Sequence, residues 1–197
     1  MNKEILKLSI PNIITNITIP LLGMVDLAIV GRLGDYRYIG AIAIATSIFN
    51  LIYWNFGFLR MGTTGFTAQS YGARSFRECA NILARGIVVA LFIAFTLIAL
   101  QKPLLRLSLY ILNANGDSAS MAIDYFNIRI WAAPATLSLY VTKGWFIGMQ
   151  NSKTPMIIAI SMNIINIISS ILFAFTLKMG IAGVALGTLL SQYSGLA

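Results

Sequence analysis

Residues 8–31 read LSIPNIITNITIPLLGMVDLAIVG, an unbroken run of 24 residues that contains one charged side chain, Asp26. A helix needs about 20 predominantly apolar residues to cross the hydrocarbon core of a bilayer. This stretch therefore predicts a membrane-spanning helix, and it sets the expected fold class of the whole chain as an all-α membrane protein.

The overall composition points the same way. Apolar residues make up 58% of the 197 residues and charged residues only 10%, and the mean hydropathy is +0.81. A soluble domain carries about 25% charged and about 45–50% apolar residues. The composition excludes a soluble globular enzyme, a disordered chain and a disulfide-stapled secreted module.

Two residue counts narrow the chemistry further. The chain has no histidine and a single cysteine, Cys79, which excludes zinc sites, histidine-based triads and CxxC redox centres. The formal charge is +8, from 14 Lys and Arg against 6 Asp and Glu. Because the basic residues fall mostly between apolar runs, we interpret them as loop charges that set membrane topology. A nucleic-acid partner is not expected.

Six membrane spans are predicted in one domain covering residues 1–197. The fourth carries Asp124, Arg129 and Lys143 and is inferred partly because the other spans require it. Short polar turns connect the spans, and residues 102–120 are expected to form the longest connection. The expected spans lie near residues 8–31, 39–71, 80–100, 121–148, 154–177 and 181–197.

The distribution of basic residues predicts the orientation. With the N-terminus inside, seven Lys and Arg residues fall on the inner side and five on the outer side. This bias favours a multi-pass protein of the cell inner membrane with a cytoplasmic N-terminus. The inner set is Lys3, Lys7, Arg74, Arg77, Arg85, Lys143 and Lys153, and the outer set is Arg32, Arg37, Lys102, Arg106 and Lys178.

Asp26 is the clearest candidate for a functional residue. An ionisable group in hydrocarbon costs at least about 2.5–3.5 kcal/mol, so it marks a functional site by default. Its sequence neighbours are apolar, and a carboxylate in such a place can take up a proton or a metal cation. The alternative is a structural role, in which Asp26 forms a static ion pair with Arg60 or Arg129.

Polar residues in the fifth and sixth spans extend this site. Asn163, Asn166 and Ser170 share one helical face, and such a stripe either joins helices or lines a cavity. At about 1.5 Å per residue, Asp26, Asn166, Ser170 and Thr188 all fall in the outer half of a core about 30 Å thick. Together they could form an oxygen-rich site for a cation or a proton.

Two prolines interrupt the first span. Pro11 and Pro20 each remove a backbone hydrogen bond and favour a bend. The bend could be passive, or it could be the hinge that opens and closes the Asp26 site.

Five segments resemble the N-terminal half of a multidrug and toxic compound extrusion (MATE) transporter, nearest the DinF-type branch. The family fold has twelve helices in two six-helix lobes. The six predicted spans therefore correspond to one lobe, and since the sixth span reaches Ala197 without a polar tail, we expect the C-terminal lobe to be missing from this chain. The segments are IPNIITNITIPLLGMVDLAIVGRLG, TAQSYGAR, GWFIGMQNSKTPM, NIINIISS and GVALGTLLSQ.

The resemblance implies roles for individual residues. Asp26 is similar to the first-helix aspartate that binds H⁺ or Na⁺, and Asn166 and Thr188 match the asparagine and threonine of that site. Pro11 matches the proline associated with bending of the first helix. Ser170 departs from the pattern, because many relatives have a second aspartate there. A neutral serine favours a proton site, although Na⁺ at Asp26, Asn166 and Thr188 stays open.

The function implied is a secondary active antiporter that exports organic or drug-like compounds. It would be driven by H⁺ or Na⁺, would need no other cofactor, and would act with a lipid bilayer, a small-molecule substrate and a second lobe. A lipid-linked oligosaccharide flippase of the same superfamily is the alternative, and it requires Arg60 and Arg129 to face the central cavity. A membrane-embedded enzyme is not expected because paired catalytic groups are missing. A purely structural subunit would require Asp26 to be locked in a salt bridge.

Overall fold

The structure is a computed structural model that describes residues 2–32, 36–114 and 116–197. Within these ranges the side chains of residues 2–8, 16, 18–22 and 36 are outside the description. The described residues form helices joined by short turns, with no strand among them. In chain order the helices are α1 (Asn2–Gly31), α2 (Tyr36–Trp54), α3 (Gly57–Gly72), α4 (Phe76–Ala99), α5 (Gln101–Ile111), α6 (Asp117–Arg129), the 3₁₀ turn η1 (Ile130–Ala132), α7 (Ala133–Gly148), α8 (Lys153–Ile171), the π-helical turn η2 (Leu172–Thr176) and α9 (Gly180–Ser194).

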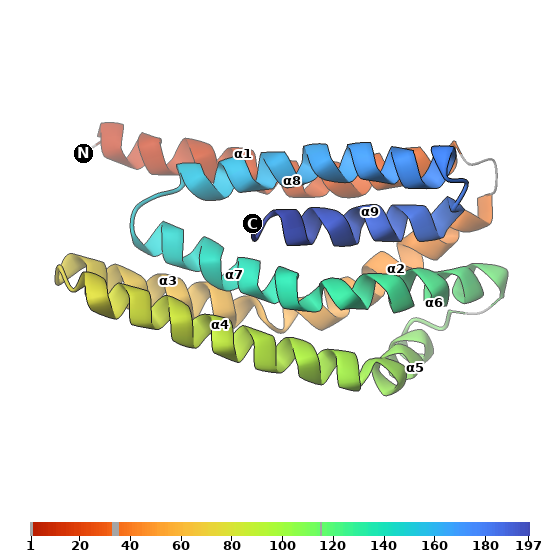
Figure 1. The fold of residues 1–197 in the computed structure, drawn as a ribbon, viewed down its shortest axis with the longest axis horizontal. Coiled ribbons are helices and arrows are strands. Elements are labelled where there is room, and N and C mark those ends of the chain that lie inside the picture. Colours follow the sequence, from red (N-terminus) through yellow and green to blue (C-terminus); the bar gives the residue numbers. More distant parts are fainter. Residues whose placement is uncertain (1, 33–35, 115) are drawn as a thin grey trace.

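The helices form an elongated bundle with two sides (Figure 1). Helices α1, α8 and α9 run along one side, and α3, α4 and α7 run along the other. Helices α2 and α6 lie against each other and complete the bundle at one end. The α3–α4 and α7–α8 turns lie at the opposite end from the α8–α9 turn.

Two of the long apolar runs are broken helices. Residues 39–71, expected as one span, contain a break at Asn55 and Phe56, where the Asn55 side-chain amide donates to the Leu51 carbonyl at 2.7 Å. Residues 121–148 contain the 3₁₀ turn η1 just before Pro134. Proline has no N–H for an α-helical bond, which accounts for the local change of helix type.

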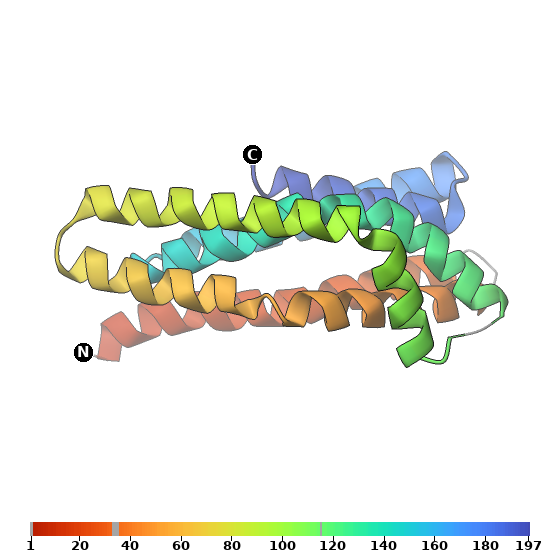
Figure 2. The same ribbon diagram turned by 90° about the horizontal axis from the view of Figure 1, so that it is seen from below.

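Residues 102–120 do not form a simple connection. They include α5, which turns away from the end of α4 and runs across the end of the bundle (Figure 2). Leu105 and Ser108 are buried on one side of α5, while Leu107 and Tyr110 are exposed. The connection between the third and fourth predicted spans therefore contains a helix, which hydropathy does not reveal because α5 is amphipathic, has 11 residues and carries two basic side chains.

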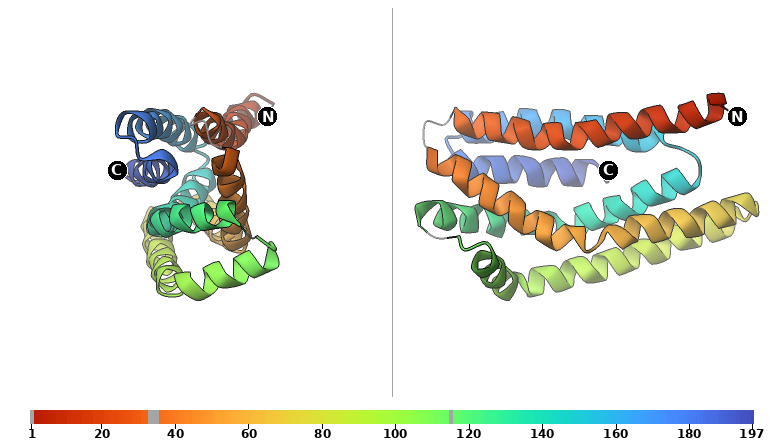
Figure 3. Two further views of the ribbon diagram at one scale, coloured as in Figure 1. Left: turned by 90° about the vertical axis from the view of Figure 1, so that its right-hand side faces the viewer. Right: turned by 180° about the vertical axis from the view of Figure 1, so that it is seen from behind.

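Small residues let neighbouring helices approach closely, and the ribbons are seen from one end and from behind in Figure 3. On α7, a Cβ atom added at Gly144 would lie 2.5 Å from the Arg60 carbonyl oxygen of α3. On α9, a Cβ atom added at Gly183 would lie 2.6 Å from the Ala174 nitrogen of η2. Contacts of this kind are typical of helices packed inside membranes.

The outer surface of the bundle is strongly apolar. Among the described residues, three helices are long and apolar enough to cross a membrane, covering residues 37–72, 76–99 and 153–176. Large side chains such as Phe92, Phe66 and Ile168 are more than half exposed. An apolar surface of this extent is expected where lipid, not water, surrounds the protein.

Candidate functional site

Asp26 is buried near the end of α1. Its side chain is 6% exposed, and its Oδ1 atom has no hydrogen-bond partner among the described residues. The charged group that acts on it electrostatically is Arg129, at the end of α6. The described residues show no ion pair between Asp26 and either Arg129 or Arg60. The structural alternative, a carboxylate locked in a salt bridge, is therefore not what the geometry provides.

Aromatic rings hold Arg129 in place. Its guanidinium carbon lies 4.6 Å from the centroid of the Phe49 ring and 5.6 Å from that of Tyr125. The guanidinium also donates a hydrogen bond of 3.3 Å to the Tyr125 hydroxyl. Both rings are fully buried, so the cation–π contacts lie where water does not screen them. Arg129 is thus fixed at the junction of α2 and α6.

Asn166 and Thr188 join α8 to α9. The Asn166 side-chain amide donates to the Thr188 hydroxyl at 3.1 Å, and that hydroxyl donates in turn to the Val184 carbonyl at 3.0 Å. Ser170 lies one turn along α8 from Asn166 and faces Gly187 of α9. All three polar side chains are buried. The structure therefore brings Asn166, Ser170 and Thr188 together: Asn166 and Ser170 share one face of α8, and Thr188 of α9 lies against it.

Three buried oxygens in this region lack a hydrogen-bond donor among the described residues. They are Asp26 Oδ1, Asn166 Oδ1 and Ser170 Oγ. Buried polar atoms nearly always have a partner, so such atoms call for an explanation. Oxygen atoms of this kind can accept a proton-bearing group or contribute to binding a hard cation.

Tyr125 connects the two halves of the site. Its side chain is 1% exposed, its hydroxyl accepts the hydrogen bond from Arg129, and its helix α6 packs against α9. Among the described residues Asp26 makes no hydrogen bond to Asn166, Ser170 or Thr188, and its helix α1 packs along α8, which carries Asn166 and Ser170. Tyr125 is one of eight tyrosines, and composition alone does not distinguish it from the others. Its four-residue spacing from Arg129 is the feature of the sequence that predicts a contact between the two side chains on one helix.

The residues predicted as a hinge or as cavity lining are Pro11, Pro20 and Asn163, and the structure describes the side chains of Pro11 and Asn163. Pro11 is buried, and its carbonyl accepts a hydrogen bond of 2.8 Å from the Thr15 hydroxyl. Asn163 is half-buried on α8, three residues before Asn166. The side chain of Pro20 is outside the described residues. Helix α1 is continuous in this conformation, so hinge motion stays a prediction.

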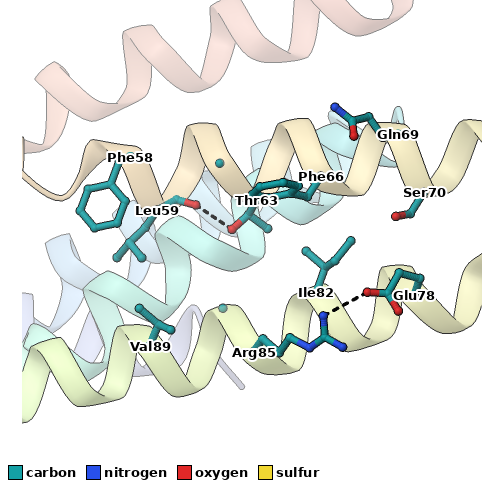
Figure 4. A pocket seen from close by; sticks show the side chains of 12 residues that line it. Phe58, Leu59, Thr63, Phe66, Gln69, Ser70, Glu78, Ile82, Arg85 and Val89 are labelled. Carbon is teal, nitrogen blue, oxygen red and sulfur yellow. Dashed lines mark hydrogen bonds and ion pairs between the residues drawn. The ribbon is translucent and has the colours of Figure 1, made fainter.

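A separate groove lies between α3 and α4 (Figure 4). It has a volume of about 420 Å³, and its twelve lining residues all come from these two helices. Phe58, Phe66 and Val89 give it apolar walls, and Arg85 pairs with Glu78 at 3.2 Å near one end. Neither Arg60 nor Arg129 lines the groove, and no residue of α1 does. It is therefore distinct from the Asp26 region.

Comparison with known proteins shows the family and the fold of the chain. The chain is 34% identical over 195 residues to the DNA damage-inducible protein F of Escherichia coli strain K12, a match that covers 99% of this chain and 42% of that protein. Two solved transporters of the MOP superfamily share its fold. The outward-facing structure of a multidrug resistance MATE family transporter has a TM-score of 0.87 at 26% identity and is covered to 43%, with 98% of this chain matched. A transporter from Pyrococcus furiosus, described as having a binding pocket of reverse polarity that suggests a different function, has a TM-score of 0.88 at 25% identity with the same coverage.

These matches confirm the predicted fold class, an all-α membrane bundle that corresponds to one lobe of a MATE transporter. The chain spans less than half the length of each of these relatives. The family model named MatE matches residues 11–172, which is most of the chain. The chain therefore belongs to the MATE family of membrane transporters.

Proposed function

We propose that this chain forms one lobe of a secondary active antiporter that exports organic, drug-like compounds from the cell. In this proposal the protein lies in the cell inner membrane with its N-terminus in the cytoplasm, and a second six-helix lobe completes it. An inward gradient of H⁺ or Na⁺ drives export, and Asp26 is the residue that couples the ion to the substrate.

The observation that carries the proposal is the buried Asp26 carboxylate, which has an oxygen without a partner and no ion pair among the described residues. A charge held in this way is costly, so neutralisation by a proton or a cation changes the stability of the surrounding packing. Helix α1 packs along α8, and Pro11 weakens the backbone hydrogen bonding of α1. Neutralising Asp26 would therefore favour a bent α1 and release of the substrate.

The charge of the site supports one coupling ion over the other. Asn166, Ser170 and Thr188 contribute neutral oxygens, and Asp26 is the single acidic group among these four. A proton needs one acceptor, whereas Na⁺ prefers several oxygens and net negative charge. The composition of the site supports H⁺ as the coupling ion, with weak Na⁺ binding at Asp26, Asn166 and Thr188 as the alternative.

Replacing Asp26 by Asn in the full-length protein tests the coupling role. We expect Asp26→Asn to remove resistance to toxic organic cations in a host without its own efflux pumps, while the amount of protein in the membrane stays unchanged. Asp124→Asn is the matched control, because Asp124 lies in the predicted fourth span but is exposed. Full resistance in the Asp26→Asn strain would reject the coupling role.

A second candidate is a flippase for anionic lipid-linked oligosaccharides. It is favoured by three half-buried cations within the predicted spans, Arg60, Lys143 and Arg129. Asp26 is a buried acidic side chain in these spans, so positive charge prevails there. Arg60 and Lys143 also interact electrostatically with each other. Reconstituted vesicles separate the two candidates. The antiporter moves a cationic dye in exchange for protons that run down an imposed gradient, whereas the flippase translocates a labelled lipid-linked sugar without such a gradient.

A further inference from the structure

We propose that the groove between α3 and α4 binds one acyl chain of an anionic phospholipid, whose headgroup lies at the α3–α4 turn. The partner is thus a lipid with a net negative headgroup, and the site is an interaction surface on the side of the bundle. Because the groove is distinct from the Asp26 region, this inference goes beyond the proposed antiporter and does not depend on it.

The groove runs lengthwise between the two helices (Figure 4). Its lining extends from Phe58 to Ser70 on α3, which at about 1.5 Å per residue is a length of about 18 Å. One leaflet of the hydrocarbon core is about 15 Å thick, half of about 30 Å. The two walls lie in residues 37–72 and 76–99, which are each long and apolar enough to cross a membrane. The groove therefore has the length that one acyl chain of one leaflet needs.

The walls of the groove are apolar and open to the surroundings. Phe58 and Phe66 on α3 and Val89 on α4 line it, and all three side chains are exposed. Helix α7 packs against both α3 and α4, so the exposed side chains mark the side of the groove that faces away from α7. A Cβ atom added at Gly62, which also lines the groove, would meet nothing within 4 Å. The groove thus holds free space between apolar side chains, which suits a hydrocarbon chain.

One end of the groove is polar and lies next to a basic turn. Gln69 and Ser70 line this end with an amide and a hydroxyl, which can donate hydrogen bonds to phosphate oxygens. Arg74 in the α3–α4 turn and Arg77 in the first turn of α4 are exposed, and neither forms an ion pair among the described residues. Basic groups between membrane helices at a membrane surface are typical of sites for anionic headgroups.

The acidic group at this end is already paired. Glu78 forms an ion pair of 3.2 Å with Arg85 and accepts a hydrogen bond of 3.0 Å from the Asn81 amide. Arg74 and Arg77 therefore leave this end of the groove with net positive charge, which favours an anionic headgroup over a zwitterionic one. The N-terminus lies at the same end of the bundle (Figure 1), so with the proposed cytoplasmic N-terminus the lipid comes from the cytoplasmic leaflet, where anionic lipids are found.

The test is lipid binding to the purified, delipidated full-length protein in detergent, measured by native mass spectrometry. Phosphatidylglycerol is the probe, and phosphatidylcholine with the same acyl chains is the control for the headgroup. We expect phosphatidylglycerol to bind at least about fivefold more tightly, because a basic residue near an anionic headgroup contributes about this factor.

Gly62→Leu tests the groove itself. The added side chain has room in the folded protein but occupies the space of the acyl chain, and we expect the affinity for phosphatidylglycerol to fall at least about tenfold. Displacing two methylene groups of the chain from apolar contact is enough for this loss. Gly65→Leu is the matched control, because Gly65 lies on the same helix, has equally open space around its Cβ position and does not line the groove.

Replacing both Arg74 and Arg77 by Gln tests the headgroup position. Binding of phosphatidylglycerol should weaken about 25-fold, the product of about fivefold for each arginine, while binding of phosphatidylcholine stays the same. Arg106→Gln is the matched control, because Arg106 is an exposed basic residue on α5 and does not line the groove.

Three results would overturn the proposal. Equal affinity of Gly62→Leu and Gly65→Leu for phosphatidylglycerol excludes the groove as the lipid site, and equal affinity of the wild type for both lipids excludes an anionic headgroup. If the second lobe covers the groove instead, Gly62→Leu melts below Gly65→Leu without lipid, and lipid binding is the same in both. None of these measurements involves Asp26, so they are independent of the resistance assay that tests the coupling role.

Discussion

Substitution of Gly187 by Ala tests the closeness of α8 and α9 at the site. A Cβ atom at position 187 would lie 2.7 Å from the Ser170 nitrogen and 2.8 Å from the Ser170 Cα atom, and it would also overlap Ser170 Oγ. Ordinary Cβ contacts begin at 3.4 Å, so the two helices must separate locally by about 0.7 Å. Backbone atoms cannot rotate away, so the strain falls on the helix pair.

The cost follows from two effects. Overpacking of a tight contact typically costs about 1–3 kcal/mol. The same separation along the Asn166–Thr188 bond would lengthen it from 3.1 Å to about 3.8 Å, beyond hydrogen-bonding range. An interhelical hydrogen bond in a membrane protein contributes about 0.6 kcal/mol on average. Together these losses amount to about 2–4 kcal/mol, enough to lower the melting temperature by several degrees.

The assay is thermal melting of the full-length protein in detergent, followed by size-exclusion chromatography after heating. Gly65→Ala on α3 is the matched control, because a Cβ atom there meets nothing within 4 Å. Alanine in a helix is favoured over glycine by about 0.5–1 kcal/mol, so this variant should melt at or slightly above the wild-type temperature. If Gly187→Ala and Gly65→Ala melt together, the close packing of α8 on α9 at Ser170 is wrong.

Two further predictions concern single side chains. Ser170→Asp adds a second carboxylate beside Asn166 and should make dye export depend on external Na⁺. The measurement is dye efflux from loaded cells with and without Na⁺. Export that stays independent of Na⁺ would show that Ser170 is not part of the ion site. Arg85→Gln removes the exposed ion pair with Glu78, where the side chains are 71% and 40% accessible, and should change stability by less than about 1 kcal/mol; a loss of many degrees in melting temperature would contradict the exposed position of that pair.

Hydropathy anticipates the helices better than their interruptions. The fourth span was inferred despite three charged residues, and the structure continues the helical path from residue 117 to 148 through η1. Asp124 is exposed, while Arg129 and Lys143 are half-buried. Averaged hydropathy does not predict the break at Asn55, the π-helical turn η2 or helix α5. Each of these features depends on local hydrogen bonding or on amphipathic packing.

Part of the candidate site can be predicted from the sequence, and part of it cannot. Asn166 and Ser170 share a helix face by spacing alone, and a tight turn after η2 brings Thr188 of α9 back beside them. The surroundings of Arg129 could not be anticipated in this way. Its contact with Phe49 joins residues 80 positions apart, and such long-range packing is set by how the helices assemble.

Proton release on substrate binding tests the central claim most directly. If Asp26 exchanges its proton for the exported compound, adding substrate to purified full-length protein in weakly buffered detergent solution must release protons, because coupling between two ligands is reciprocal. A pH-indicator dye should report about one proton released per bound substrate in the wild type and none in Asp26→Asn. Equal proton release from both proteins would contradict the account.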